Sequence, residues 1–148
     1  MTPKVAYTVG YQGIDIEEMA RAAKIAGVTL VIDARRNPTS RRPAFRREAL
    51  RRRLAEHGLD YESRPALGVP RRVRALARTR PALFRAAYRG VLSRATVDMD
   101  ETVLRISQET VALLCFEAEP GECHRSLLAD AITARAPISF VDLDVRRI

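Results

Sequence analysis

The sequence predicts a single α/β domain over residues 1–148, with a mostly parallel sheet of about five strands and helices on both faces. Short apolar segments alternate along the chain with segments of helical periodicity, an order typical of parallel sheets. Two apolar segments, residues 28–34 (VTLVIDA) and 110–117 (TVALLCFE), carry few polar residues, as central strands covered on both faces do. The length is that of one domain, and no repeat or linker divides the chain.

The first three predicted elements follow one another with short connections. Residues 5–10 (VAYTVG) are rich in β-forming residues and end at a glycine, which favours a strand. Residues 15–27 are predicted to be a helix, because Asp15 and Glu18 resemble a capping box and apolar residues recur on one helical face. The chain then enters the apolar strand at 28–34.

The rest of the chain continues the alternation. A polar loop over residues 35–43 precedes a helix of about residues 45–57, which is expected to bury Ala49, Leu50 and Leu54. The remaining predicted elements are a strand at 59–63, short helices or loops over the proline-interrupted segment 64–94, a helix at about 98–108, the strand at 110–117, a helix at 124–135 and a last strand at 138–143.

The charge of the chain is concentrated in its middle. The formal net charge is +8, but residues 35–94 hold 18 basic and 4 acidic residues, a net +14, and the remainder carries −6. Of the 26 basic residues 24 are arginine, whose planar guanidinium suits phosphate and carboxylate recognition. This distribution predicts an anionic partner, either a phosphorylated small molecule or nucleic acid.

The composition also favours one cellular compartment. No stretch approaches the roughly 20 apolar residues that span a bilayer, and residues 1–13 lack the apolar region of a signal peptide. With 2 cysteines and no export signal, we expect a cytoplasmic protein with reduced thiols and no membrane contact.

The predicted topology by itself nominates a site. Ligands of open parallel sheets bind at the carboxyl ends of the strands. Here these ends lead into the loops that begin at Gly10, Asp33, Ser63, Cys115 and Asp142. The candidate residues in and after these loops are Tyr11, Gln12, Asp33, Arg35, Arg36, Glu117, Cys123, His124 and Arg125.

The run Cys123-His124-Arg125 carries the most reactive combination of side chains. Cys123 lies at the start of a predicted helix, where backbone N–H groups and the helix dipole stabilise a thiolate. The same geometry binds a phosphate, with Arg125 as a donor. The alternative is that Cys123 merely begins the helix and His124 forms local hydrogen bonds.

Cys115 belongs to an apolar strand, which favours a packing role because free cysteine is often buried. A zinc site of Cys115, Cys123 and His124 with Asp33 or Glu117 is an alternative. The separation of the two cysteines matches none of the short metal-ligand spacings, so we expect no metal and no cofactor. The phosphatase-like loop is absent too, because neither cysteine has a basic residue several positions downstream.

Three segments carry specific motifs: YTVGYQG at 7–13, IDARRNPTSRRPAF at 32–45 and LLCFEAEPGECHRSLLAD at 113–130. In this order they resemble the family known as domain of unknown function 488, over nearly the whole chain and more loosely over 69–94. The resemblance implies a fold and a site but no established reaction. The family pattern carries over to Tyr11, Asp33, Arg35, Cys115, Glu117, Cys123, His124 and Arg125.

The leading hypothesis is a small enzyme that acts on an anionic substrate, either a phosphate-bearing compound or nucleic acid. Convergence of thiol, acidic and basic residues at one sheet edge motivates it. In this hypothesis Cys123 is the nucleophile or thiolate, Asp33, Glu117 or His124 transfers protons, Arg35 and Arg125 bind the anion, and Tyr11, Arg36 and Cys115 complete the substrate site.

Two other hypotheses remain open at this stage. A non-catalytic module would bind nucleic acid through the arginine-rich segment 35–94, mostly by phosphate contacts because aromatic residues are sparse there. A structural zinc or redox-sensing domain is the third. The sequence leaves the oligomeric state open.

Overall fold

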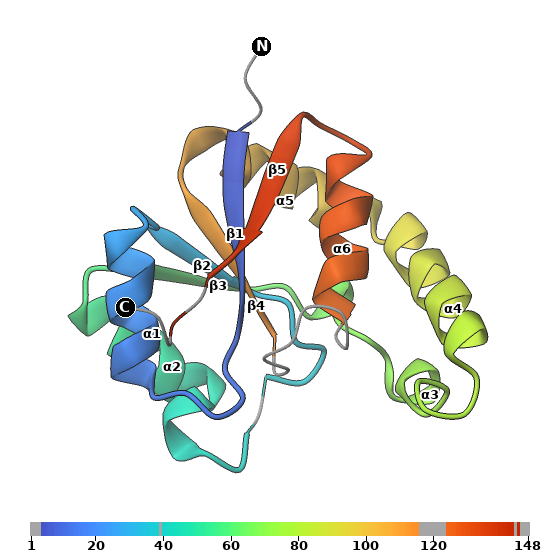
Figure 1. The fold of residues 1–148 in the computed structure, drawn as a ribbon, viewed down its shortest axis with the longest axis horizontal. Helices are drawn as coiled ribbons and strands as arrows, with labels where there is room; N and C mark the ends of the chain where they lie inside the picture. Colours follow the sequence, from blue (N-terminus) through green and yellow to red (C-terminus); the bar gives the residue numbers. More distant parts are fainter. Residues whose placement is uncertain (1–3, 39, 116–123, 144, 146–148) are drawn as a thin grey trace.

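The computed structural model describes residues 4–38, 40–115, 124–143 and 145, and it confirms the predicted α/β class. Five strands, all parallel, form one sheet in the order β3-β2-β4-β1-β5 (Figure 1). The strands are β1 (Lys4–Gly10), β2 (Leu30–Asp33), β3 (Asp60–Ser63), β4 (Val111–Cys115) and β5 (Ile138–Asp142).

Helices cover both faces of this sheet, as the sequence predicted. One core joins α1 and α2 to the side chains on one face of the strands, and a second core joins α4, α5 and α6 to the other face (Figure 1). The described helices are α1 (Ile16–Ile25), α2 (Arg47–Glu56), α3 (Arg71–Arg74), α4 (Pro81–Arg94), α5 (Thr96–Gln108) and α6 (His124–Thr133), with short 3-10 turns η1 (Pro43–Phe45) and η2 (Pro65–Leu67).

The alternating direction of side chains along the central strands explains why the sheet contributes to two cores. Ala112 and Leu114 of β4 belong to the core beneath α1 and α2, whereas Val111 and Leu113 belong to the core beneath α4, α5 and α6. Successive side chains of a strand point to opposite faces, so an uninterrupted apolar strand supplies both.

The strand order creates a switch point beside β4. This strand lies between β1 and β2, which lead into α1 and α2 on one face, whereas the next described helix after β4 is α6 on the other face. The three strands end level, because Gly10 pairs with Cys115 and Asp33 with Leu114. Ligand sites of such sheets form at this kind of position.

Two elements differ from the prediction. Asp15 caps α1 by accepting a hydrogen bond from Glu17 N at 3.0 Å, rather than through a reciprocal pair with Glu18. Within 64–94, where short helices or loops were expected, α4 extends over 14 residues. Pro81 stands in its first turn, where a proline favours a helix instead of breaking it.

Candidate functional site

A buried ion pair stands at the carboxyl edge of the sheet. Asp33, the last residue of β2, is fully buried and Arg35 is 5% exposed. Arg35 Nε donates to Asp33 Oδ1 at 2.8 Å, and its Nη2 donates to Oδ2 at 2.7 Å. The backbone N–H of Arg35 also donates to Oδ1, at 3.1 Å. This bidentate pairing holds the Arg35 side chain against the end of β2.

The ion pair is completed by groups from three other segments. Arg35 Nη1 donates to the carbonyl oxygen of Phe45 at 2.8 Å and to the hydroxyl of Tyr11 at 3.3 Å. The hydroxyl of Tyr61, on β3, donates to Asp33 Oδ2. Four of the five guanidinium N–H donors therefore have partners inside the protein. At the carboxyl edge of the sheet, the network joins β2, β3, η1 and the residue that follows β1.

The pKa directions agree with this pairing. Burial alone would lower the pKa of Arg35, but the hydrogen bonds and charge of Asp33, aided by Tyr11, raise it above its usual value. Burial and the Asp33 charge raise the pKa of Tyr61 above that of an ordinary tyrosine. The charged guanidinium and the neutral phenol are thus the forms that the network stabilises.

A stack of rings and guanidinium groups covers the ion pair. The rings of Tyr11 and Phe45 lie parallel, with centroids 4.4 Å apart, and the Arg35 guanidinium lies 5.3 Å from the Tyr11 centroid. Arg42 lies over the Phe45 ring at 4.5 Å and donates to the carbonyl oxygens of Tyr11, at 2.8 Å, and Ile14. We call the set Tyr11, Asp33, Arg35, Arg42, Phe45 and Tyr61 the locked edge.

Arg36 lies beside the locked edge, and fewer of its guanidinium N–H groups than those of Arg35 have hydrogen-bond partners among the described residues. Its Nη2 donates to the carbonyl oxygen of Gly68 at 3.2 Å, while its buried Nε has no hydrogen-bond partner within the described ranges. Gly68 fits closely here, because an added Cβ would lie 2.1 Å from the backbone nitrogen of Arg36 and 2.8 Å from the oxygen of Ala34. The segment before α3 therefore packs directly on the loop that follows β2.

The predicted thiol site is described only in part. Cys115 ends β4 fully buried, as a packing role requires, and its carbonyl oxygen accepts from Tyr11 N at 3.1 Å. Glu117 and Cys123 lie outside the described residues. His124 and Arg125 are the first two residues of α6, with their backbone described and their side chains not.

Three residues of the locked edge were missed as site residues by the sequence analysis: Arg42, Phe45 and Tyr61. Their hydrogen-bond partners lie between 10 and 31 residues away, and Tyr61 and Phe45 are isolated aromatic residues in a basic segment. The available signal was the pair Asp33-x-Arg35 itself, because a buried ion pair requires further hydrogen-bond partners.

The arginines of the basic segment fall into two groups. Those between residues 35 and 64 are largely engaged: Arg53 pairs with Glu17, and Arg64 with Glu62, Asp98 and Glu101. The arginines of α3, α4 and the connection between them are exposed, and within the described part of the chain their side chains make no hydrogen bond or ion pair. These eight are Arg71, Arg72, Arg74, Arg78, Arg80, Arg85, Arg89 and Arg94.

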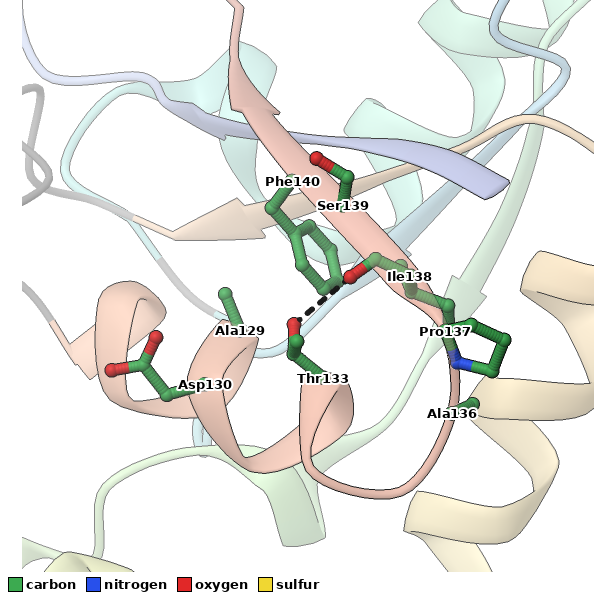
Figure 2. A pocket seen from close by; sticks show the side chains of 8 residues that line it. All are labelled: Ala129, Asp130, Thr133, Ala136, Pro137, Ile138, Ser139 and Phe140. Atoms are coloured by element: carbon green, nitrogen blue, oxygen red, sulfur yellow. Dashed lines mark hydrogen bonds between the residues drawn. The ribbon is translucent and has the colours of Figure 1, made fainter. Parts of the chain in front are cut away.

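Two hollows lie away from the carboxyl edge. Figure 2 shows one of about 390 Å³ between α6 and the amino end of β5, where Thr133 Oγ1 donates to the Ile138 oxygen at 3.2 Å. The other, of about 420 Å³, is lined by residues of α4, α5 and α6 that include Arg89 and Asp130. Within the described ranges no group of three or more His, Cys, Asp or Glu residues is arranged to hold a metal ion.

The described residues define a parallel α/β protein with a buried polar network at the carboxyl edge of its sheet. A family model described as domain of unknown function DUF488 matches residues 15–132, so the chain belongs to this family. No curated protein and no solved structure matches the chain. No helix in the described part of the chain is long and apolar enough to cross a membrane.

Proposed function

We propose that this protein is a small enzyme that acts on an anionic, phosphate-bearing substrate at the carboxyl edge of its sheet. The observation that carries the proposal is Arg36, in the loop that follows β2, whose buried Nε lacks a hydrogen-bond partner among the described residues. A buried donor without a partner costs about 1–3 kcal/mol, a cost that an anionic ligand removes. A phosphate accepting from Arg36 would supply that partner.

The locked edge assigns different tasks to neighbouring residues. Asp33 accepts four hydrogen bonds and Arg35 donates most of its own within the protein, so both act as positioning residues. Anion binding then falls to Arg36 and to Arg125 in the first turn of α6. This reassigns Arg35 and Asp33 from the substrate-binding and proton-transfer roles predicted from sequence.

The chemical step is proposed for Glu117, Cys123 and His124, which precede or begin α6 in the sequence. Cys123 immediately precedes this helix, whose N-terminal N–H groups stabilise a thiolate there and make it a nucleophile. The thiolate displaces a leaving group from the substrate as the bond to that group breaks, and His124 or Glu117 protonates the leaving group. Water, or an acceptor in a transfer reaction, then displaces the thiolate and regenerates it. The reaction class is thiol-dependent transfer or hydrolysis of a phosphate-bearing compound.

The experiment compares iodoacetamide alkylation of the two cysteines across pH, by peptide mass spectrometry of the native protein. Cys123 should react with an apparent pKa well below the ordinary value of about 8.5. Cys115 is fully buried and serves as the internal control that reacts slowly. Inorganic phosphate should slow alkylation of Cys123, and Arg36→Gln should weaken that protection while the exposed Arg52→Gln does not. An ordinary pKa at Cys123, or rates indifferent to phosphate, would overturn the proposal.

A further inference from the structure

We propose that the arginine segment, residues 71–94 of α3, α4 and their connection, binds the phosphate backbone of duplex nucleic acid. This surface is separate from the enzyme site and does not depend on it. The segment carries eight arginines, and residues 65–97 contain no Asp or Glu. All eight are exposed.

The contrast with other arginines is what singles out this surface. Arg51, on α2, has Glu48 as a neighbour at 3.3 Å, and Arg135 pairs with Asp100. In the part of the chain that the structure describes, no arginine of the segment has such an ion-pair partner; Asp130, which lines the hollow beside Arg89, comes from α6. Eight positive charges without ion-pair partners among the described residues repel one another, and a polyanion relieves that repulsion.

The shape of the segment suits a line of phosphates. The 14 residues of α4 span about 20 Å, and Arg85 and Arg89 stand one turn apart on it. In Figure 1, α3 and α4 form the right-hand margin of the molecule, with α6 on their inner side. Duplex DNA presents about one charge per 1.7 Å of axis, so several phosphates fall within this reach.

The aromatic residues favour a duplex over a single strand. Tyr88 is fully buried and donates to the oxygen of Leu67 at 2.6 Å. Phe84 stacks on Tyr88 and packs against the same core. Single-strand binding surfaces expose aromatic rings on which bases stack, and these two rings turn inward instead. Contacts with phosphates and little sequence preference are the expected mode.

The surface also has a defined place relative to the sheet. Gly68 packs against the backbone of Arg36, and α3 begins three residues later at Arg71. In Figure 1, α3 lies toward the end of the molecule where the strands terminate. The arginine segment carries a formal charge of +8, equal to the net charge of the whole chain, so the other residues together are neutral and attract a polyanion less. A duplex would therefore lie along α3 and α4.

The test is fluorescence anisotropy of a labelled 25-base-pair DNA duplex with the full chain, from about 50 to 200 mM salt. The wild type should bind with an affinity that falls steeply with salt. Arg85→Gln/Arg89→Gln should weaken binding about tenfold or more and reduce the slope of log K against log salt by about 2, since each phosphate contact contributes about 0.9.

Arg21→Gln/Arg52→Gln is the matched control. It removes the same charge from exposed arginines of α1 and α2, on the other face of the sheet, and should change affinity less than twofold. Equal losses in the two double variants would overturn the proposal, as would absence of duplex binding at low salt. Tighter binding of poly-glutamate would assign the surface to an acidic polypeptide, and tighter binding of a matched single strand would also contradict it. Cys123→Ser should bind the duplex like the wild type, so failure of the enzyme proposal is seen separately.

Discussion

The locked edge and the arginine segment use the same side chain in opposite ways. At the edge, Arg35 is 5% exposed and its charge is matched by Asp33, with Tyr11 and Phe45 completing its hydrogen bonds. Along α3 and α4 the arginines are exposed and, among the described residues, unpaired. The comparison shows that burial and pairing decide the role of a guanidinium. The buried and paired Arg35 stabilises the fold, whereas the exposed arginines of α3 and α4 are available to an anion outside the protein.

The largest expected effect on stability is that of Arg35→Gln at the locked edge, which is compared with the same type of substitution in the arginine segment. Arg35→Gln leaves the buried Asp33 without its cation and should lower the free energy of unfolding by about 3–5 kcal/mol. Arg85→Gln removes an exposed guanidinium with no internal partner and should change it by less than about 0.5 kcal/mol. Urea unfolding followed by circular dichroism measures both. Similar values for the two variants would contradict the contrast between a structural and a free arginine.

A pair of glycines extends the comparison to the backbone. Gly68→Ala places a Cβ 2.1 Å from the backbone nitrogen of Arg36, which cannot move without disturbing the locked edge. We expect a loss of about 3 kcal/mol, at the upper end of the usual overpacking range. Gly90→Ala in α4 meets only the end of the flexible Arg94 side chain, at 3.4 Å, and should gain about 0.5–1 kcal/mol from helix propensity.

The two substitutions are predicted to have opposite signs, so thermal unfolding of the pair is sufficient to check them. Destabilisation by both variants would mean that α4 is as tightly constrained as the edge. Toleration of Gly68→Ala would mean that the segment 65–70 can move away from Arg36. Crystal structures of the variants are not needed for either decision.

The fold could be predicted from sequence because its central strands carry their own signal. The apolar runs that became β2 and β4 allow few other placements, and their order gives the parallel sheet. The helix α4 was missed because Pro81 suggested a break, although its inward-facing Tyr88 and Leu92 recur at helical spacing.

The candidate site was only partly predictable. Topology correctly placed Asp33 and Arg35 at the carboxyl edge, because the ends of parallel strands meet there. It gave no sign of the buried network, because the further partners of the ion pair come from η1 and β3: Phe45 accepts from Arg35, and Tyr61 donates to Asp33. Long-range pairing of this kind leaves no local pattern in a single sequence. The roles of Glu117 and Cys123 stay predictions, since both lie outside the described residues.

A smaller loss than those of Arg35→Gln and Gly68→Ala is expected at Tyr61, and it sharpens the description of the locked edge. Tyr61→Phe removes one of the hydrogen bonds to Asp33 but leaves the Arg35 pairing intact, so we expect a loss of about 1 kcal/mol at neutral pH. Urea unfolding of the variant beside the wild type measures it. A loss as large as that of Arg35→Gln would mean that the phenol, and not the guanidinium, is the main partner of the carboxylate.

The same variant gives a pH test with a definite sign. Burial and the Asp33 charge raise the pKa of Tyr61 in the folded state, so the folded protein retains this proton at a pH where the unfolded chain has released it. Its contribution to stability is complete below the ordinary tyrosine pKa of about 10 and is lost as pH rises through the higher folded-state value. The tyrosinate absorbance of the wild type minus that of Tyr61→Phe isolates this one titration. A difference curve centred at or below pH 10 would show that the phenol is not held against Asp33, and that the edge is locked by Arg35 alone.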